Sequence, residues 1–291
     1  MAQSRPAGPD GLAVVDKAAG WTSHDVVAKA RGVLGTRKIG HSGTLDPDAT
    51  GVLLLGVGRV TRLLRYLGLP AKRYTGVLVL GTATSTLDSS GEVTGTWDMG
   101  DVPLNAVRGA AARLTGDILQ VPPMVSAIQV GGRRLHELAR EGIEVERAPR
   151  PVRITRFDVA ATGDPAVLAI DVECSGGTYV RTLAADLGHL LGGGAHLRNL
   201  RRTAVGPYGI DEARPPDECE LLEPMEAVRG LARVDVDDAT AALVGNGRVL
   251  PAPPGVGPWA LVAPGDRLLA VYEPFRSGEA KPAVVLAAAT A

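Results

Sequence analysis

Cysteine is scarce in this sequence and no apolar run is long, and each shortage excludes a class of protein. The two cysteines, Cys174 and Cys219, stand far apart and belong to no Cys-x-x-Cys motif or histidine cluster. We therefore expect neither a disulfide framework nor a zinc site, and a reducing cytoplasm as the compartment. No apolar run approaches the roughly 20 residues of a membrane span, and residues 1–10 lack the apolar core of a signal peptide.

A strong charge of either sign is also missing, since the net charge is −1. The arginines nevertheless gather in short stretches, whereas acids concentrate around residues 217–226 and 235–238. Such segregation can create a basic groove for RNA on a nearly neutral protein, although any single cluster can equally be a solvated surface. The basic clusters are Arg59, Arg62 and Arg65; Lys72 and Arg73; Arg133, Arg134 and Arg140; and Arg198, Arg201 and Arg202.

Residues 40–51 place unusual backbone residues around one carboxylate and are the centre of the functional prediction. Three glycines permit tight turns or close approach, and Pro47 disfavours a helical conformation at Asp46. The apolar run at residues 52–55 predicts a buried strand that carries this loop. This backbone would hold the Asp46 carboxylate in a fixed position outside a helix, as a nucleophile or a general base requires. Two other interpretations stay open here: an ordinary Asp-Pro turn, and a metal or phosphotransfer site formed with Asp48.

Hydrophobic periodicity around this loop predicts alternating short strands and amphipathic helices. Residues 82–100, rich in Gly, Ser and Thr, predict a loop or hairpin. Gly56 and Gly58 mimic a dinucleotide-binding turn, but Thr61 occupies the third glycine position and no acid follows at the required distance. The predicted strands are residues 12–15, 53–57, 75–80 and 167–174, and the predicted helices are residues 22–35, 59–67, 103–114 and 179–191.

Length and composition favour a large domain at residues 1–230 and a small one at residues 231–291. The chain has 291 residues and 45% hydrophobic content, enough to fill both cores. Two prolines, paired glycines and dense arginines in residues 120–153 predict a mobile arm within the first domain. Prolines and acids from about residue 215 predict a linker. Beyond it, a β-rich domain is predicted from brief strands at residues 259–262, 267–272 and 284–286.

Three motifs in the same order resemble those of the bacterial tRNA pseudouridine-55 synthases of the TruB type. HSGTLDPDATG at residues 41–51 resembles the family's catalytic loop, CSGGTYVRTL at residues 174–183 its second signature, and GAHLRNLRR at residues 194–202 a third block. DKAAGWTSHDVV at residues 16–27 is similar to its opening segment, except that Ala18 stands where the family usually has proline. The joint occurrence of these motifs is far more specific than any one of them.

The resemblance implies an α+β fold, in which a mixed-sheet catalytic domain precedes a small β-rich domain of the PUA type. It implies isomerisation of the T-arm uridine of tRNA, position 55, to pseudouridine, without cofactor or metal, by a monomer that needs no protein partner. Residues 120–153 would be a thumb-like arm over the T arm, with Gln129 and His136 where the family more often has lysine and tyrosine. The guide-RNA-dependent synthases of the dyskerin type share the motifs, and a non-catalytic RNA-binding protein is the alternative from another class.

The resemblance also assigns roles to the matched residues. In the family, the aspartate of the catalytic loop is the nucleophile and the arginine of the second signature pairs with it. The tyrosine of the K-R-Y run contacts the target base, and an apolar residue of the third block lines the uridine pocket. The candidate catalytic residues are therefore Asp46, Arg181 and Tyr74, and the candidate substrate-binding residues are His41, Tyr179, Leu200, Lys17 and Arg202.

Elementary chemistry gives several of these roles a reason. A stacked base must be flipped out at a cost of roughly a few kcal/mol, and stacking on Tyr74 would return about 1–3 kcal/mol. His41 could fill the vacancy left in the RNA. Asp46 must be ionised to attack, so Arg181 is expected to lower its pKa; at the first turn of a helix that arginine itself needs a carboxylate partner. Attack at C1′, attack at C6 and a glycal route all stay open.

Overall fold

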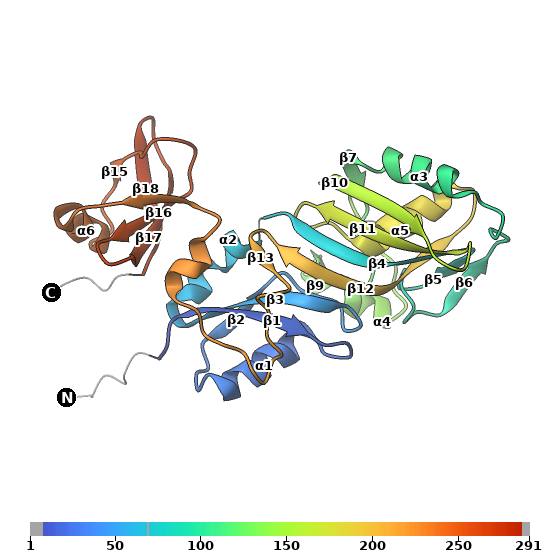
Figure 1. Cartoon of the computed structure of the whole chain (residues 1–291), viewed down its shortest axis with the longest axis horizontal. Helices are drawn as coiled ribbons and strands as arrows, with labels where there is room; N and C mark the ends of the chain where they lie inside the picture. The colour runs from blue at the N-terminus through green and yellow to red at the C-terminus, as the bar shows by residue number, and fades with distance from the viewer. Residues whose placement is uncertain (1–7, 69, 287–291) are drawn as a thin grey trace.

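The computed structural model describes residues 8–68 and 70–286, which form a nine-stranded mixed sheet and a second, five-stranded sheet (Figure 1). The larger sheet runs in the order β1-β3-β12-β4-β11-β10-β7, with β2 paired to β3 and β13 to β12. Its described pairings are antiparallel except that β12 runs parallel to β3. Its strands are β1 (Gly11–Lys17), β2 (Ile39–Ser42), β3 (Thr50–Val57), β4 (Lys72–Leu80), β7 (Gly116–Gln120), β10 (Arg150–Ala161), β11 (Val167–Cys174), β12 (Ala195–Val205) and β13 (Tyr208–Gly209).

The β1–β3 end of this sheet is covered on both faces, which explains why the run at 52–57 is apolar without alternation. Leu53 and Leu55 pack under helix α1 (Ser23–Val33), whereas Val52 and Leu54 face an apolar cluster shared with the second sheet. Helix α1 begins where predicted, because Thr22 and Asp25 form a reciprocal capping box. The buried strand therefore fixes the loop that precedes it.

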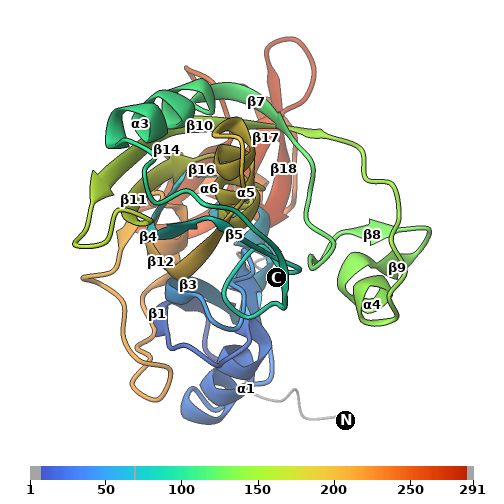
Figure 2. The same cartoon turned by 90° about the vertical axis from the view of Figure 1, so that its right-hand side faces the viewer.

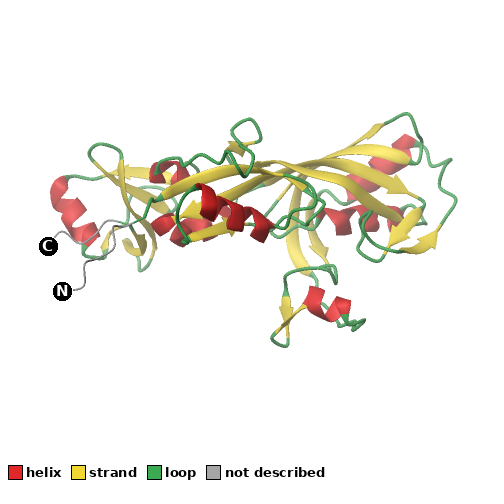
Figure 3. Ribbon diagram, turned by 90° about the horizontal axis from the view of Figure 1, so that it is seen from below, coloured by secondary structure: helices red, strands yellow, loops and turns green. Residues whose placement is uncertain are grey.

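The other end of the sheet is covered on one face by α3 (Leu104–Arg113) and α5 (Val180–Leu190), as Figures 1 and 3 show. Strand β11 alternates accordingly: Leu168, Ile170 and Val172 are buried in this core, and Asp171 and Glu173 are only partly covered. The predicted hairpin at 82–100 is present as β5 (Thr82–Thr84) and β6 (Val93–Thr96).

Between β7 and β10 the chain leaves the sheet as a small lobe that projects from the body (Figures 2 and 3). The lobe holds β8 (Gln129–Val130), β9 (Arg133–Arg134) and α4 (Leu135–Arg140). Leu135 and Leu138 are buried, so the lobe packs its own apolar side chains. The segment predicted as an arm at 120–153 forms this projecting lobe, and its first and last residues belong to the strands β7 and β10.

The second sheet begins at Ala232 and contains the strands predicted at 259–262 and 267–272. It runs in the order β14-β16-β17-β18-β15 and is flanked by helix α6 (Asp238–Gly245). The predicted α+β class with a β-rich C-terminal domain is confirmed. No helix in the described ranges is long and apolar enough to span a bilayer. The strands are β14 (Ala232–Asp235), β15 (Leu250–Pro251), β16 (Trp259–Ala263), β17 (Arg267–Pro274) and β18 (Glu279–Val285).

The basic stripe at Arg59, Arg62 and Arg65 joins the two sheets and forms no open basic groove. The helix predicted at 59–67 is a 3₁₀ helix (Gly58–Leu63) followed by the short α2 (Leu64–Gly68). Arg59 pairs with Asp10 and donates to the Leu286 carbonyl, Arg62 donates to the Val285 carbonyl at 2.7 Å, and Arg65 pairs with Glu273 at 2.8 Å. Sequence cannot reveal such partners, because they lie more than 200 residues away for Arg62 and Arg65.

Candidate active site

The loop between β2 and β3 is held at every second residue by a polar side chain from another element. Gly43 O accepts from Arg202 Nη2 at 3.0 Å, Leu45 N donates to Ser23 Oγ at 2.9 Å, and Pro47 O accepts from Lys17 Nζ at 2.8 Å. The three side chains come from β12, α1 and β1, and all are buried. The backbone on both sides of Asp46 is therefore fixed.

Lys17 acts on this loop from within the protein. Its side chain is fully buried, and its ammonium donates to three carbonyls, those of Ala18, Trp21 and Pro47, at 2.6–2.9 Å. Burial lowers the pKa of Lys17 to about 8, so the ammonium form prevails at neutral pH. All three N–H bonds are satisfied, and Lys17 does not line the cavity beside Asp46. Its contacts are those of a residue that positions the loop.

Asp46 and Arg181 meet although 135 positions separate them. Arg181 Nε lies 2.8 Å from Asp46 Oδ2 and its Nη2 lies 3.0 Å from Oδ1, which is a two-pronged pair. The guanidinium is buried, with 4% of its side chain exposed, while the Asp46 side chain keeps 38% exposure. The carboxylate is thus aimed by a rigid partner and still open to a ligand.

Two further donors of Arg181 are occupied by main-chain carbonyls. Nη1 donates to Thr86 O at 2.7 Å and Nη2 donates to Val125 O at 3.0 Å, a contact with the segment that enters the projecting lobe. Asp88 Oδ2 lies 3.6 Å from Nε, so two carboxylates share one guanidinium. The other Asp88 oxygen accepts from Thr86 Oγ1 and from Ser90 N and Oγ at 2.6–3.0 Å. These bonds fix the geometry of the pair.

The pKa of Asp46 is raised, chiefly because burial disfavours the charged carboxylate. Arg181 opposes this shift, and the neighbouring Asp88 adds to it. The expected effect of Arg181, to lower the pKa of Asp46, is present, but desolvation outweighs the ion pair and the net shift is upward. Arg181 limits the rise rather than reversing it.

A cavity of about 250 Å³ opens beside this pair and receives most of the predicted site residues. Tyr179 caps the N-terminus of α5, where its backbone N and O are held by the buried Gln120 side chain at 2.8 and 3.1 Å. Tyr74 is only 7% exposed, and burial raises its pKa. The predicted residues that line the cavity are Asp46, Tyr74, Tyr179, Arg181, Leu200 and Arg202.

His41 lies outside the cavity, and the arginines of the third block have three different environments. His41, in β2, is half-buried and outside the cavity lining, and its Nδ1 has no hydrogen-bond partner among the described residues. Arg202 is 1% exposed, and Arg201 pairs with Asp16 at 2.7 Å. This cluster does not form a continuous basic surface, because of its three arginines only Arg198 is an exposed side chain without a described ion pair.

Three residues that support the site carried no clear signal in the sequence. Asp88 lies in the Ser/Thr/Gly-rich hairpin, Ser23 in the first turn of α1, and Gln120 at the end of β7. Each is polar, and Ser23 and Gln120 are buried. A buried polar residue is recognisable only when its burial is known. The rival interpretation of Asp46 and Asp48 as metal ligands finds no support, since the described part of the chain contains no group of three or more acidic, histidine or cysteine side chains placed around a common point.

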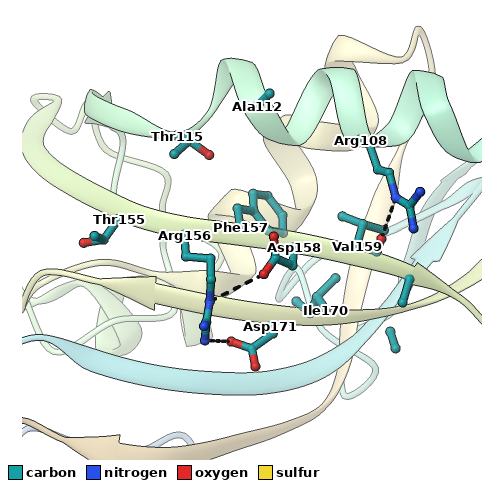
Figure 4. A pocket seen from close by; sticks show the side chains of 12 residues that line it. Arg108, Ala112, Thr115, Thr155, Arg156, Phe157, Asp158, Val159, Ile170 and Asp171 are labelled. Carbon is teal, nitrogen blue, oxygen red and sulfur yellow. Dashed lines mark hydrogen bonds and ion pairs between the residues drawn. The ribbon is translucent and has the colours of Figure 1, made fainter.

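A larger cavity, about 830 Å³, lies between α3 and β10 (Figure 4). Its charged side chains are already occupied within its own walls. Arg156 pairs with Asp171 and, at 3.6 Å, with Asp158. Arg108 Nε donates to the Val159 carbonyl at 3.0 Å. None of the motif residues lines this groove.

Two family models match consecutive parts of the chain. The model of the TruB family pseudouridylate synthase N-terminal domain matches residues 31–180, and that of the tRNA pseudouridylate synthase B C-terminal domain matches residues 181–228. The matched region contains the loop at Asp46, strand β4 and the helix that carries Arg181.

Curated relatives match along almost the whole chain. A protein of Streptomyces coelicolor is 48% identical in an alignment of 289 positions that covers 94% of this chain and 96% of the relative. A protein of Mycolicibacterium paratuberculosis is 46% identical over 97% of this chain and 99% of its own length. Both are named tRNA pseudouridine synthase B.

Solved structures agree with these matches at lower identity. A chain of a Cbf5-Nop10-Gar1 complex superposes with a TM-score of 0.71 at 26% identity, covering 92% of this chain and 79% of that one. A chain of an H/ACA ribonucleoprotein bound to a substrate RNA containing 2′-deoxyuridine gives a TM-score of 0.68 at 25% identity, covering 90% and 77%. With consecutive family models and full-length relatives in agreement, this protein belongs to the TruB family of pseudouridylate synthases and is an enzyme of that class.

Proposed function

We propose that this enzyme isomerises uridine 55 in the T arm of tRNA to pseudouridine, with Asp46 as nucleophile. The observation that carries this proposal is the two-pronged Asp46–Arg181 pair at the wall of a cavity that can hold one base. A rigid guanidinium keeps the carboxylate aimed and limits its pKa, so that a nucleophile is available in a partly dry site. The tRNA substrate named for the relatives supports the choice of RNA.

The reaction conserves atoms and electrons, so it needs no oxidant and no added group. In the C1′ route, Asp46 bonds C1′ while the N1–C1′ electron pair leaves with the uracil. The base turns, C5 bonds C1′, and the bond to Asp46 breaks. The proton lost from C5 is balanced by the proton gained at N1. Attack at C6 and a glycal route give the same product and place the same carboxylate at the reacting centre.

The other cavity residues have roles in binding and in proton transfer. Tyr179 and Leu200 bound the space for the flipped base, and Tyr74 contacts it and is a candidate to receive the C5 proton, alone or through water. His41, neutral because burial lowers its pKa, is placed outside the cavity and would occupy the gap left in the RNA stack. The projecting lobe and the exposed Arg198 would contact the RNA backbone.

The test is incubation of the purified protein, alone and without cofactor, with unmodified tRNA transcript, followed by mapping of pseudouridine. We expect modification at position 55 only. A transcript with cytidine at position 55 is the matched control and should stay unmodified. Modification elsewhere would refute the substrate assignment, and turnover that requires an added guide RNA or protein would favour the dyskerin-type alternative.

A further inference from the structure

Lys72 places an ammonium group at the wall of the catalytic cavity without a partner. The residue is 8% exposed and lines the cavity, yet none of the described residues gives it a hydrogen bond or an ion pair. A Cβ added to Gly43 would lie 3.2 Å from Lys72 Nζ and 3.6 Å from Arg202 Nη1. The ammonium and the guanidinium therefore converge on one corner, beside the catalytic loop.

Among the described residues, this corner holds the cationic groups of two buried residues, and no carboxylate acts on Lys72. Arg202 uses its donors on the main-chain oxygens of Val52 and Gly43, which carry no net charge. Burial lowers the pKa of Lys72, and the nearby Arg202 lowers it further. The Cys174 thiol is the other group that acts on Lys72, and burial raises the pKa of that thiol to about 11, so the thiol is neutral. An isolated buried cation is unfavourable. Such an arrangement is expected where a negative group is to arrive.

The register of β4 places Lys72 beside Tyr74, the residue proposed above to contact the base. Lys72 and Tyr74 are two residues apart and share one face of the strand, and Tyr74 lies opposite Arg202 on β12. Tyr74, Asp46 and Lys72 line the same cavity, together with Arg202. A nucleoside with its reacting atom at Asp46 would extend its base along Tyr74 toward the ammonium.

Negative charge develops on the base in each of the three chemical routes. When the N1–C1′ bond breaks, the electron pair spreads over N1, O2 and O4; when Asp46 attacks C6, it spreads over C5 and O4. The charge disappears when C5 bonds C1′ and the proton balance is restored. We propose that the Lys72 ammonium donates to a carbonyl oxygen of the target uracil and stabilises this transient charge, assisted by Arg202. This proposal rests on the function proposed above, and Lys72 keeps its protons throughout.

The decisive experiment measures the single-turnover rate constant at saturating tRNA transcript for Lys72→Met, Lys72→Arg and the control Lys29→Met. Lys29 is an exposed lysine of α1, so its replacement removes the same charge away from the cavity. We expect Lys72→Met to lose about 10²–10³-fold in rate, as for the loss of one preorganised donor. The dissociation constant for RNA should change little, Lys72→Arg should recover part of the rate, and Lys29→Met should equal the wild type.

Thermal unfolding separates this role from a structural one. Because the residue is largely buried and its ammonium has no described partner, Lys72→Met should unfold at the same or a higher temperature than the wild type. If Lys72→Met fails to fold, Lys72→Gln compared with Lys72→Arg gives the same decision, since these differ in charge. A Lys72→Met or Lys72→Gln enzyme with a near-normal saturated rate overturns the proposal.

An anionic oxygen could also come from the phosphate next to the target nucleotide, and a neutral methylphosphonate at that position distinguishes the two sources. If Lys72 contacts the base, the methylphosphonate and Lys72→Met should change the free energy of RNA binding independently of each other. If instead Lys72→Met weakens binding only of the RNA with the charged phosphate, and leaves the single-turnover rate at saturation unchanged, the ammonium binds the phosphate and its role at the base is overturned. Failure of the wild type to form pseudouridine, by contrast, would refute the proposed function itself.

Discussion

The cavity at Asp46 and the groove between α3 and β10 are both concave and both rich in charge, yet they differ in how that charge is compensated. In the groove, Arg156 is paired by acids of the same wall. In the smaller cavity, Lys72 has no ion pair with any described residue and Asp46 stays partly open. Uncompensated charge in a buried place requires a ligand. The arrangement of charge, and not the volume, therefore identifies the functional cavity.

Replacing Asp46 by Asn should give the largest loss, because it removes the nucleophile and keeps its shape. We expect pseudouridine formation under single-turnover conditions to fall by about 10⁴-fold or more. Binding of the tRNA transcript, measured at equilibrium, should be retained. Substantial turnover by the Asp46→Asn enzyme would mean that the carboxylate has no chemical role. The cavity at Asp46 would then no longer be distinguished from the groove as the site of the reaction.

Replacing Arg181 by Lys should cost about 10²–10³-fold, because a point charge cannot make the two-pronged pair. Burial raises the pKa of Asp46 and Arg181 opposes that rise. A weaker partner lets the carboxyl protonate at higher pH, so the acidic limb of the rate profile should move to higher pH. A pH–rate profile with an unmoved acidic limb would contradict the electrostatic role of Arg181.

Replacing Asp88 by Asn should move the acidic limb of the pH–rate profile in the direction opposite to that expected for Arg181→Lys. Asp88 raises the pKa of Asp46, so its neutralisation should shift the acidic limb to lower pH. The maximal rate should nevertheless fall by up to about 10²-fold, because Arg181 loses one of the groups that fix its position. Shifts of the same sign in Asp88→Asn and Arg181→Lys would refute the shared-guanidinium interpretation.

Replacing Lys17 by Met should destabilise the fold, in contrast to Lys72→Met. Three carbonyls lose their hydrogen bonds to a buried ammonium, and we expect about 2–4 kcal/mol less free energy of unfolding. Denaturant unfolding of the two variants, side by side with the wild type, measures the difference. If Lys17→Met and Lys72→Met were equally stable, the hydrogen bonds of Lys17 would not contribute to stability as its contacts indicate.

Replacing Arg156 by Ala in the groove should have the smallest effect. Its ion pairs are exposed, and pairs of that kind contribute little. We expect kcat/KM for the tRNA transcript to stay within about twofold of the wild type. A tenfold loss in kcat/KM with normal stability would show that the groove takes part in RNA binding. Compensated charge would then not mark a cavity without function.

Much of the fold was predictable because it follows from local chemistry. Thr22 and Asp25 mark the start of α1, and the alternation at 167–174 corresponds to β11, which is covered by helices on one face. The contact between Asp46 and Arg181 was also expected, from a resemblance and from the need of an arginine in a first helical turn for an acid. Asp88 was missed because a Ser/Thr/Gly-rich hairpin shows no periodicity that would distinguish one acid in it.

The misjudged residues are charged side chains whose surroundings depend on distant segments. Lys72, Arg201 and Arg202 look like members of basic surface clusters in the sequence, but Lys72 and Arg202 are buried and Arg201 is paired with Asp16. Gly51 shows the physical reason: a Cβ there would lie 2.1 Å from the Arg202 carbonyl, so β3 and β12 approach closely and enclose the guanidinium beside them. No local pattern reports that approach.

The sequence by itself determined the stiff loop around Asp46, the apolar strand that carries it and the family to which three ordered motifs belong, since each depends on residues adjacent in the chain. Only the tertiary structure decided which charges are compensated. Arg181 is shared by acids at positions 46 and 88, Lys17 has three acceptors and Lys72 has no described partner. Whether a charge is compensated depends on which groups lie near it in space. Burial determines how strongly those groups interact with the charge.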